Sequence, residues 1–99
     1  MSLNIEKKTE DSSIILKGRL DTTTAPELEK YLEKELPGLS EVVFDFENLE
    51  YISSAGLRVL LMAQKLMNQK NGSMKLIHVN EMVQEVFEIT GFTDILTIE

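Results

Sequence analysis

Two adjacent serines, Ser53 and Ser54, are the residues of this chain best placed to carry chemistry. They are followed by the small pair Ala55-Gly56, which leaves backbone and hydroxyl groups open to an approaching molecule. A predicted helix begins here, and the free amides and partial positive charge of about 0.5 at a helix N-terminus stabilise a phosphoryl group. A phosphoserine adds a charge of about −1.5 to −2, which disrupts a docked interface. Helix capping by either hydroxyl, worth about 1 kcal/mol, explains the same spacing, and on spacing alone capping is favoured.

The residues that enzymes commonly use are scarce in this sequence. It contains no Cys, no glycine-rich phosphate loop, and neither an HExxH nor a GxSxG motif. The single histidine, His78, falls on a predicted strand, where a structural role is more frequent, and Asp45 is interpreted as a sheet-face residue. We therefore predict no catalytic residue, no cofactor and no metal site. A pocket that unites His78 with a strongly shifted carboxylate would instead indicate an enzyme.

Composition narrows the class of partner. The chain has 99 residues and a formal net charge of −7, which disfavours nucleic acid because such binding depends on Lys and Arg neutralising phosphates. The longest nearly uncharged apolar stretch, Val59–Met67, is far shorter than the ~20 residues of a membrane helix. We expect a cytoplasmic protein that is monomeric when free and contacts neither nucleic acid nor membrane.

The apolar pattern predicts a single α/β domain, residues 1–99, that holds the serines at a strand-to-helix turn. The expected order is β-β-α-β-α-β-α-β, with a mixed sheet and right-handed crossovers that place the helices on one face. Within the third strand, Val43 and Asp45 should point away from the face that carries Phe44. The predicted strands are 3–8, 13–19, 42–46, 74–79 and 92–98, with a turn at 9–12 and a loop at 47–52. The predicted helices are 25–36, from the serines to 69, and 81–90.

The second predicted helix carries two leucines, Leu57 and Leu61, among its polar residues. At 100° per residue, its sheet-facing arc is predicted to contain Val59, Leu60, Met62, Ala63, Leu66 and Met67. Two interpretations of Leu57 and Leu61 stay open. Neighbouring helices cover them, or they form an exposed apolar pair that binds a protein. The polar rim of such a patch would be Arg58, Gln64, Lys65 and Asn68.

Four segments, in order along nearly the whole chain, resemble the STAS domain of bacterial anti-sigma factor antagonists. These segments are Gly18–Asp21, Val42–Phe46, Ile52–Leu61 and Phe87–Phe92, of which the third is the most specific. The resemblance implies a protein that binds an anti-sigma factor, itself a serine kinase, and thereby releases the sigma factor. Phosphorylation by that kinase would break the complex, and a PP2C-type phosphatase would restore it. ATP, magnesium and the catalytic base would come from the partner.

The same resemblance assigns Ser54 as the phosphorylated serine. Many members have Asp immediately before this serine, whereas this chain has Ser53, which is the second candidate acceptor. Asp21 matches an acidic residue that lies near the switch serine in the family, although capping of the first helix explains it equally well. The alternative function is a constitutive STAS scaffold in a stress-signalling assembly or a transporter complex. The predicted partner-binding residues are Asp21, Ser53, Ser54, Gly56, Leu57, Arg58, Leu61, Gln64 and Lys65.

Overall fold

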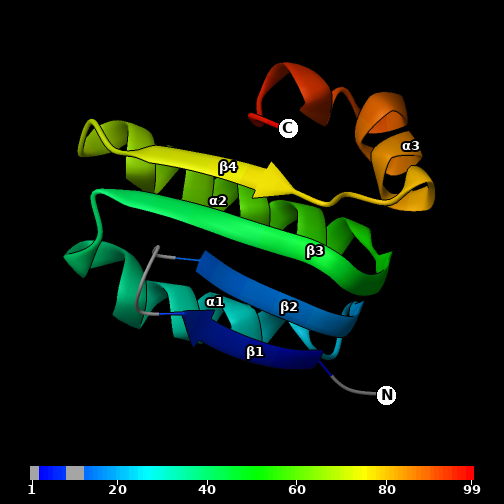
Figure 1. Ribbon diagram of the computed structural model, residues 1–99, viewed down its shortest axis with the longest axis horizontal. Coiled ribbons are helices and arrows are strands. Elements are labelled where there is room, and N and C mark those ends of the chain that lie inside the picture. The colour runs from blue at the N-terminus through cyan, green and yellow to red at the C-terminus, as the bar shows by residue number, and fades with distance from the viewer. Residues whose placement is uncertain (1–2, 9–12) are drawn as a thin grey trace.

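A four-stranded mixed sheet forms the centre of the computed structural model, which describes residues 3–8 and 13–99 (Figure 1). The turn predicted at 9–12 lies outside the described residues. The strand order is β1-β2-β3-β4; β1 pairs with β2 antiparallel, whereas β2, β3 and β4 run parallel to one another. The strands are β1 (Leu3–Lys8), β2 (Ser13–Leu20), β3 (Glu41–Ile52) and β4 (Ser73–Ile77). The predicted α/β class and mixed sheet are confirmed.

Three α-helices connect and follow the parallel strands. They are α1 (Ala25–Glu35), α2 (Ser54–Gln69) and α3 (Glu81–Thr90), and α1 continues into a 3-10 turn at Leu36–Gly38. Figure 1 shows α1 and α2 side by side behind the sheet, as right-handed crossovers require. The ring of Phe87 on α3 lies 6.4 Å from that of Phe46 on β3, so α3 packs against the same face of the sheet.

The core lies between the sheet and these helices. Along β3, Phe44 and Phe46 are fully buried, whereas Val43 and Asp45 are only partly covered and lie on the opposite face. This alternation confirms the predicted orientation of the strand. The other face of the sheet carries no helix in the described part of the chain.

Two boundary predictions are wrong. The loop predicted at 47–52 is instead the second half of β3, because β2 continues to pair with it through two register shifts and Leu49 and Ile52 become buried there. The strand predicted at 92–98 is a short 3-10 turn, Phe92–Asp94, followed by a single parallel bridge between Ile98 and Leu76. Gly91, at φ 81°, ends α3 in the left-handed conformation and turns the chain sharply, so too little extended chain remains to form a strand.

Within the described ranges, no helix is sufficiently long and apolar to cross a membrane.

Candidate functional site

Two turns meet at the carboxyl ends of β2 and β3. The turn after β2 leads into α1, and the turn after β3 leads into α2. They are joined directly, because the Ser53 amide donates a hydrogen bond of 2.9 Å to the carbonyl of Leu20. Sites in open α/β sheets commonly lie at this end of the strands. The predicted residues Asp21, Ser53 and Ser54 are therefore brought to one end of the sheet.

Gly56 allows α2 to begin this close to β2. A Cβ atom at this position would lie 2.6 Å from Cγ and 2.9 Å from Cδ2 of Leu20, and 3.0 Å from Cγ1 of Ile52. These separations are well below the 3.5–4.0 Å at which carbon atoms normally make contact. Only glycine therefore fits between the first turn of α2 and the ends of β2 and β3, so the predicted site role of Gly56 is one of close packing.

The two serines have different surroundings. Ser53 is the N-cap residue of α2, and its Oγ accepts a long hydrogen bond of 3.5 Å from the Gly56 amide. Ser54 is the first helical residue and is exposed, and its hydroxyl has no hydrogen-bond partner among the described residues. Ser53 thus provides the cap that the sequence predicted for one of the two, and Ser54 is open to solvent at the helix N-terminus.

Asp21 organises the neighbouring turn. Its Oδ1 accepts hydrogen bonds from the Thr23 hydroxyl at 2.7 Å and from the amides of Thr23 and Thr24 at 3.0 and 3.1 Å. The hydrogen bond from the Thr23 hydroxyl is the main cause that lowers the pKa of Asp21, and the two amides add to it. Since the N-cap position of α1 belongs to Thr24, Asp21 stabilises the turn ahead of the helix and carries a negative charge there.

Arg19 balances part of this charge. Its Nε lies 3.7 Å from Oδ2 of Asp21, and its guanidinium carbon lies 4.2 Å from the centre of the Tyr51 ring. Neither Arg19 nor Tyr51 is among the predicted site residues, although Arg19 lies in the family-like segment Gly18–Asp21. Their pairing depends on the second half of β3, where Arg19 and Tyr51 are register partners and where a loop was predicted.

The predicted patch on α2 is correct only in part. Leu57 is 5% exposed and Gln64 is 7% exposed. For Leu57 the interpretation of a covered residue is therefore confirmed and that of an exposed one is wrong, and Gln64 does not belong to an exposed polar rim. Leu61 is half-buried, whereas Arg58 and Lys65 are exposed as predicted. The buried face of α2 is therefore rotated from the predicted arc towards Leu57.

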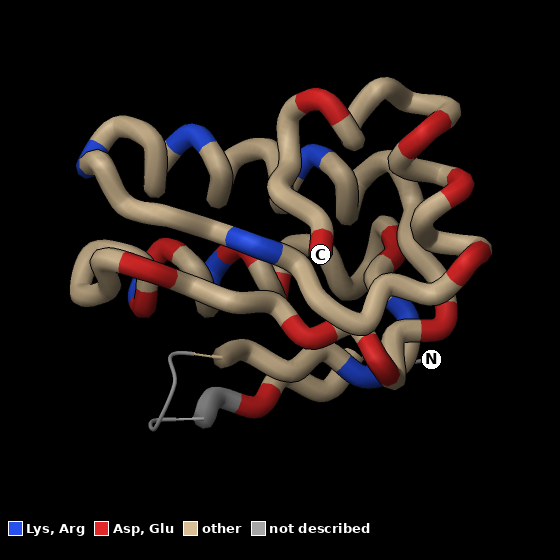
Figure 2. The backbone as a smooth tube through the Cα atoms, turned by 45° about the horizontal axis from the view of Figure 1, so that its top comes forward, with Lys and Arg blue, Asp and Glu red and all other residues tan. Residues whose placement is uncertain are grey.

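This rotation leaves Met62 and Leu66, which were predicted to face the sheet, half-exposed. A shallow hollow of about 350 Å³ results on the outer face of α2. We call its lining the α2 face: Arg58, Leu61, Met62, Lys65, Leu66 and Gln69. Figure 2 shows that α2 carries basic residues and no acidic residue, in contrast to the acidic α3. The site thus combines an exposed serine with an adjoining apolar and basic face.

Asp45 and His78 form a hydrogen-bonded pair that is separate from the two serines and from the α2 face. Oδ1 of Asp45 lies 3.0 Å from Nδ1 of His78, and the hydrogen bond to Asp45 is the main cause that raises the pKa of His78. Both belong to the side of the sheet that lacks helices, and His78 is exposed with φ at 58° just after β4. Neither residue lines the α2 face. Across the described residues, no cluster of three or more His, Cys, Asp or Glu side chains is arranged to hold a metal ion.

Comparison with known proteins finds matches that cover nearly the whole chain. A sequence model of the STAS domain matches residues 2–99. The anti-sigma-B factor antagonist of Staphylococcus aureus is 34% identical over 101 residues, which cover 99% of this chain and 94% of the relative. An anti-sigma factor antagonist from Mycobacterium paratuberculosis has a similar structure, with a TM-score of 0.85 and 18% identity over 97% of this chain and 84% of the other. The phosphorylated form of SpoIIAA, a Bacillus cell fate determinant, has a TM-score of 0.72 and 16% identity over 98% and 90%.

Proposed function

We propose, from the premise that this chain belongs to the STAS-domain family of anti-sigma factor antagonists, that it is a partner-switching regulator controlled at Ser54. In its unphosphorylated form it would bind an anti-sigma factor that is also a serine kinase, and so release the sigma factor. The observation that carries the proposal is the exposed Ser54 hydroxyl, which lies unpaired at the start of α2 while Ser53 provides the cap.

The α2 face is the docking surface in this proposal. It continues from Ser54 along the exposed side of the helix, since Arg58 lies one turn beyond the serine and Leu61 and Lys65 follow at helical spacing. Half-buried Leu61, Met62 and Leu66 supply apolar contact area, and Arg58 and Lys65 select a partner surface that carries acidic groups. The predicted binding role of Leu57 and Gln64 is not retained, because both side chains are buried.

Phosphorylation would act through charge rather than through unfolding. A phosphate on Ser54 would lie beside the free amides of the first turn of α2, which favour an anion there. The same phosphate would add a charge of about −1.5 to −2 at the edge of the docking surface, next to the negative turn held by Asp21. An acidic partner surface would be repelled, and the antagonist would dissociate with its fold intact. The similarity to a fold that has been solved in a phosphorylated form supports this step.

All catalysis belongs to the partners in this scheme. The kinase supplies ATP, magnesium and the base that accepts the serine proton, and a PP2C-type phosphatase removes the phosphate. The antagonist, which acts in the cytoplasm beside its partners, contributes an accessible hydroxyl and a face that positions it. This chain is therefore a substrate and regulator, with no enzymatic step of its own.

The proposal is tested by incubating the chain with its cognate kinase and ATP and locating the phosphate by peptide mass spectrometry. We expect one phosphate, on Ser54, and none on the Ser54→Ala variant. The Ser53→Ala variant is the matched control and should still accept phosphate. A chain that stays unmodified at both serines would overturn the switch, and phosphate on Ser53 alone would transfer the acceptor role to the capping residue.

A further inference from the structure

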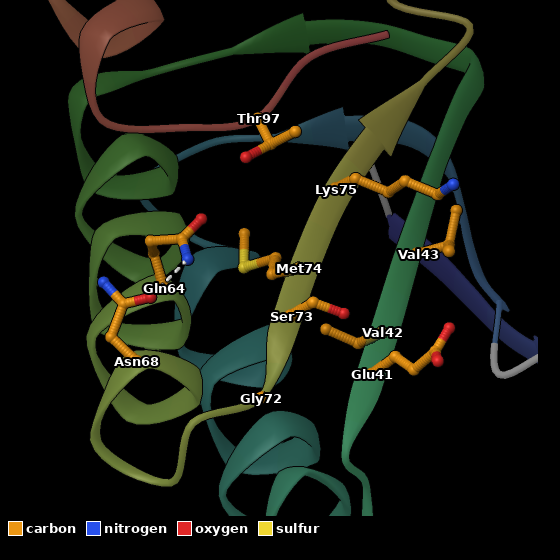
Figure 3. Close-up of a pocket in the computed structure, with 10 residues that line it drawn as sticks. All are labelled: Glu41, Val42, Val43, Gln64, Asn68, Gly72, Ser73, Met74, Lys75 and Thr97. Carbon is orange, nitrogen blue, oxygen red and sulfur yellow. Dashed lines mark hydrogen bonds between the residues drawn. The ribbon is translucent and has the colours of Figure 1, made fainter.

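Arg58 lines three of the hollows that border α2. One is the hollow of the α2 face, and two smaller hollows, of about 260 and 160 Å³, lie between α2 and α1, where Glu29 lines both. A further hollow, of about 300 Å³, lies beside Met74 of β4 and is lined by Gln64 and Asn68 (Figure 3). It contains neither serine and no residue of the α2 face. Arg58 therefore lies between the proposed docking surface and the groove beside α1.

The guanidinium of Arg58 has no short-range partner. Its side chain is exposed and makes no hydrogen bond or ion pair with any described residue. Glu29 is the acidic residue that shares both smaller hollows with it, and the two opposite charges attract each other across the groove. The other arginine of the chain, Arg19, is instead held by Asp21 and the ring of Tyr51. A new anion near Arg58 would therefore meet a guanidinium that no close contact restrains.

Ser54 lies one helical turn before Arg58 on α2. Side chains four residues apart on a helix are neighbours, with Cβ atoms about 5–6 Å apart, and helical side chains lean towards the N-terminus. One of the hollows beside α1 is accordingly lined by Arg58 together with Ala55, the residue that follows Ser54. Figure 3 shows the same spacing bringing two side chains of α2 together, since Nε2 of Gln64 donates to Oδ1 of Asn68 at 3.0 Å. A phosphate on Ser54 would thus lie within reach of Arg58.

We propose, resting on the proposed switch at Ser54, that Arg58 is the internal partner of the phosphate and changes position when Ser54 is phosphorylated. In the unphosphorylated chain it borders the α2 face, where an acidic partner can bind it, and is attracted by Glu29. After phosphorylation it forms an ion pair with the phosphate, because a phosphate carries more charge than one carboxylate and accepts two N–H groups of a guanidinium. The α2 face then keeps only one of its two cations, Lys65. Phosphorylation would therefore remove a docking contact in addition to repelling the partner.

The test uses the whole chain with phosphoserine inserted at position 54 during translation, so that no kinase is needed. A pH titration followed by 31P NMR measures the second pKa of the phosphate, which is about 6 for phosphoserine. Arg58→Gln should raise this pKa by about 0.3 pH units, because Arg58 stabilises the dianion. Lys65→Gln is the matched control. It removes the same charge about 16 Å farther along the helix, beyond the screening length at physiological salt, and should leave the pKa unchanged.

NMR of the 15N-labelled arginine side chains identifies the arginine that binds the phosphate. The chain contains two arginines, so two Nε–H resonances are expected. The resonance of Arg58 should shift and exchange more slowly with water when Ser54 carries the phosphate, whereas that of Arg19 should stay in place. Glu29→Gln should shift the Arg58 resonance in the unphosphorylated chain and have no effect on it in the phosphorylated chain.

Three results would overturn the proposal: a phosphate pKa that is the same with and without Arg58, a phosphate-dependent shift of Arg19 in place of Arg58, or an effect of Glu29→Gln that phosphorylation leaves unchanged. Failure of the proposed function would give a different result, because the phosphate is inserted without the kinase. A chain that the kinase leaves unmodified, while the inserted phosphate still pairs with Arg58, would refute the switch and not the ion pair.

Discussion

Replacing Gly56 with Ala tests the packing that fixes the position of Ser54. In an ordinary helix interior this change would stabilise by about 1 kcal/mol, because Ala has the higher helix propensity. Here the added Cβ would lie 2.6 Å and 2.9 Å from two carbons of Leu20, a residue with no exposed surface. Because Leu20 is fully buried, it can move away only by displacing its neighbours, and overpacking of this kind costs about 1–3 kcal/mol. Set against the helix-propensity gain, this cost leaves a net loss of up to about 2 kcal/mol of unfolding free energy.

The assay measures thermal unfolding by differential scanning calorimetry, and Gly38→Ala is the matched control. A Cβ at Gly38 meets no atom within 4 Å, so this substitution should be neutral or stabilise by about 0.4–1 kcal/mol through the unfolded chain. Each kcal/mol shifts the melting temperature by roughly 4–8 °C in a domain of this size. Gly56→Ala should therefore melt several degrees below the parent chain, and Gly38→Ala at or above it.

A double-mutant cycle identifies the clash as the cause. Leu20→Ala removes both leucine carbons that the new Cβ would approach, so Gly56→Ala should cost clearly less in that background. If Gly56→Ala melts as high as Gly38→Ala, or costs the same with and without Leu20, the close approach of α2 to β2 does not constrain this turn.

Three further predictions concern the serines and the Asp45–His78 pair. Ser54→Asp should abolish anti-sigma factor binding by calorimetric titration while the melting temperature stays level or rises, since a carboxylate in the first turn of α2 gains about 0.3–1 kcal/mol; Ser54→Asn is the uncharged control, and an unfolded Ser54→Asp chain would refute the anion-site argument. Ser53→Ala should lose about 0.5–1 kcal/mol of stability in denaturant titrations and keep phosphorylation at Ser54. Asp45 raises the folded-state pKa of His78, so the interaction between the two side chains stabilises the folded protein. This stabilisation is complete below the unfolded-state pKa of His78, about 6.5, and is lost as pH rises through the folded-state pKa. Stability measured across this range should fall with pH in the parent chain and not in His78→Asn.

The sequence predicted the architecture well where several local signals agreed. The bounds of α3 follow from an Asn80 cap, an apolar period and a terminal Gly91, and the structure contains each of these features. The alternation in β3 correctly separated Val43 and Asp45 from the buried face. The extension of β3 to Ile52 could not be predicted, because Glu47–Glu50 is largely polar and its strand conformation depends on pairing with β2.

The site was predicted less completely than the fold, for a physical reason. The hydrophobic pattern predicted that Met62 and Leu66 face the sheet. The residues of a helix that become buried, however, depend on which strands and helices pack against it. Met62 borders the gap towards α1 together with Glu29, whereas Gln64 lies over β4 and becomes buried despite its amide. The sequence alone does not indicate that a polar residue such as Gln64 will pack against an edge strand. The hollow beside Met74 is consequently a feature that only the structure reveals.

Ser53 and Ser54 would have different roles within one helical turn: Ser53 caps α2, and Ser54 is the proposed phosphate acceptor. Asp and Ser are about equally good N-caps, so the serine at position 53 loses nothing in capping compared with the Asp expected there from the family resemblance. A neutral cap also removes one negative charge from the residue that adjoins Ser54, where a phosphate would otherwise be repelled by it. The Ser53 oxygen accepts a hydrogen bond from the Gly56 amide, whereas the Ser54 side chain is exposed, so Ser54 is the more accessible hydroxyl for the proposed kinase. Under the proposed switch, we therefore expect phosphorylation at Ser54 rather than at the capping residue Ser53.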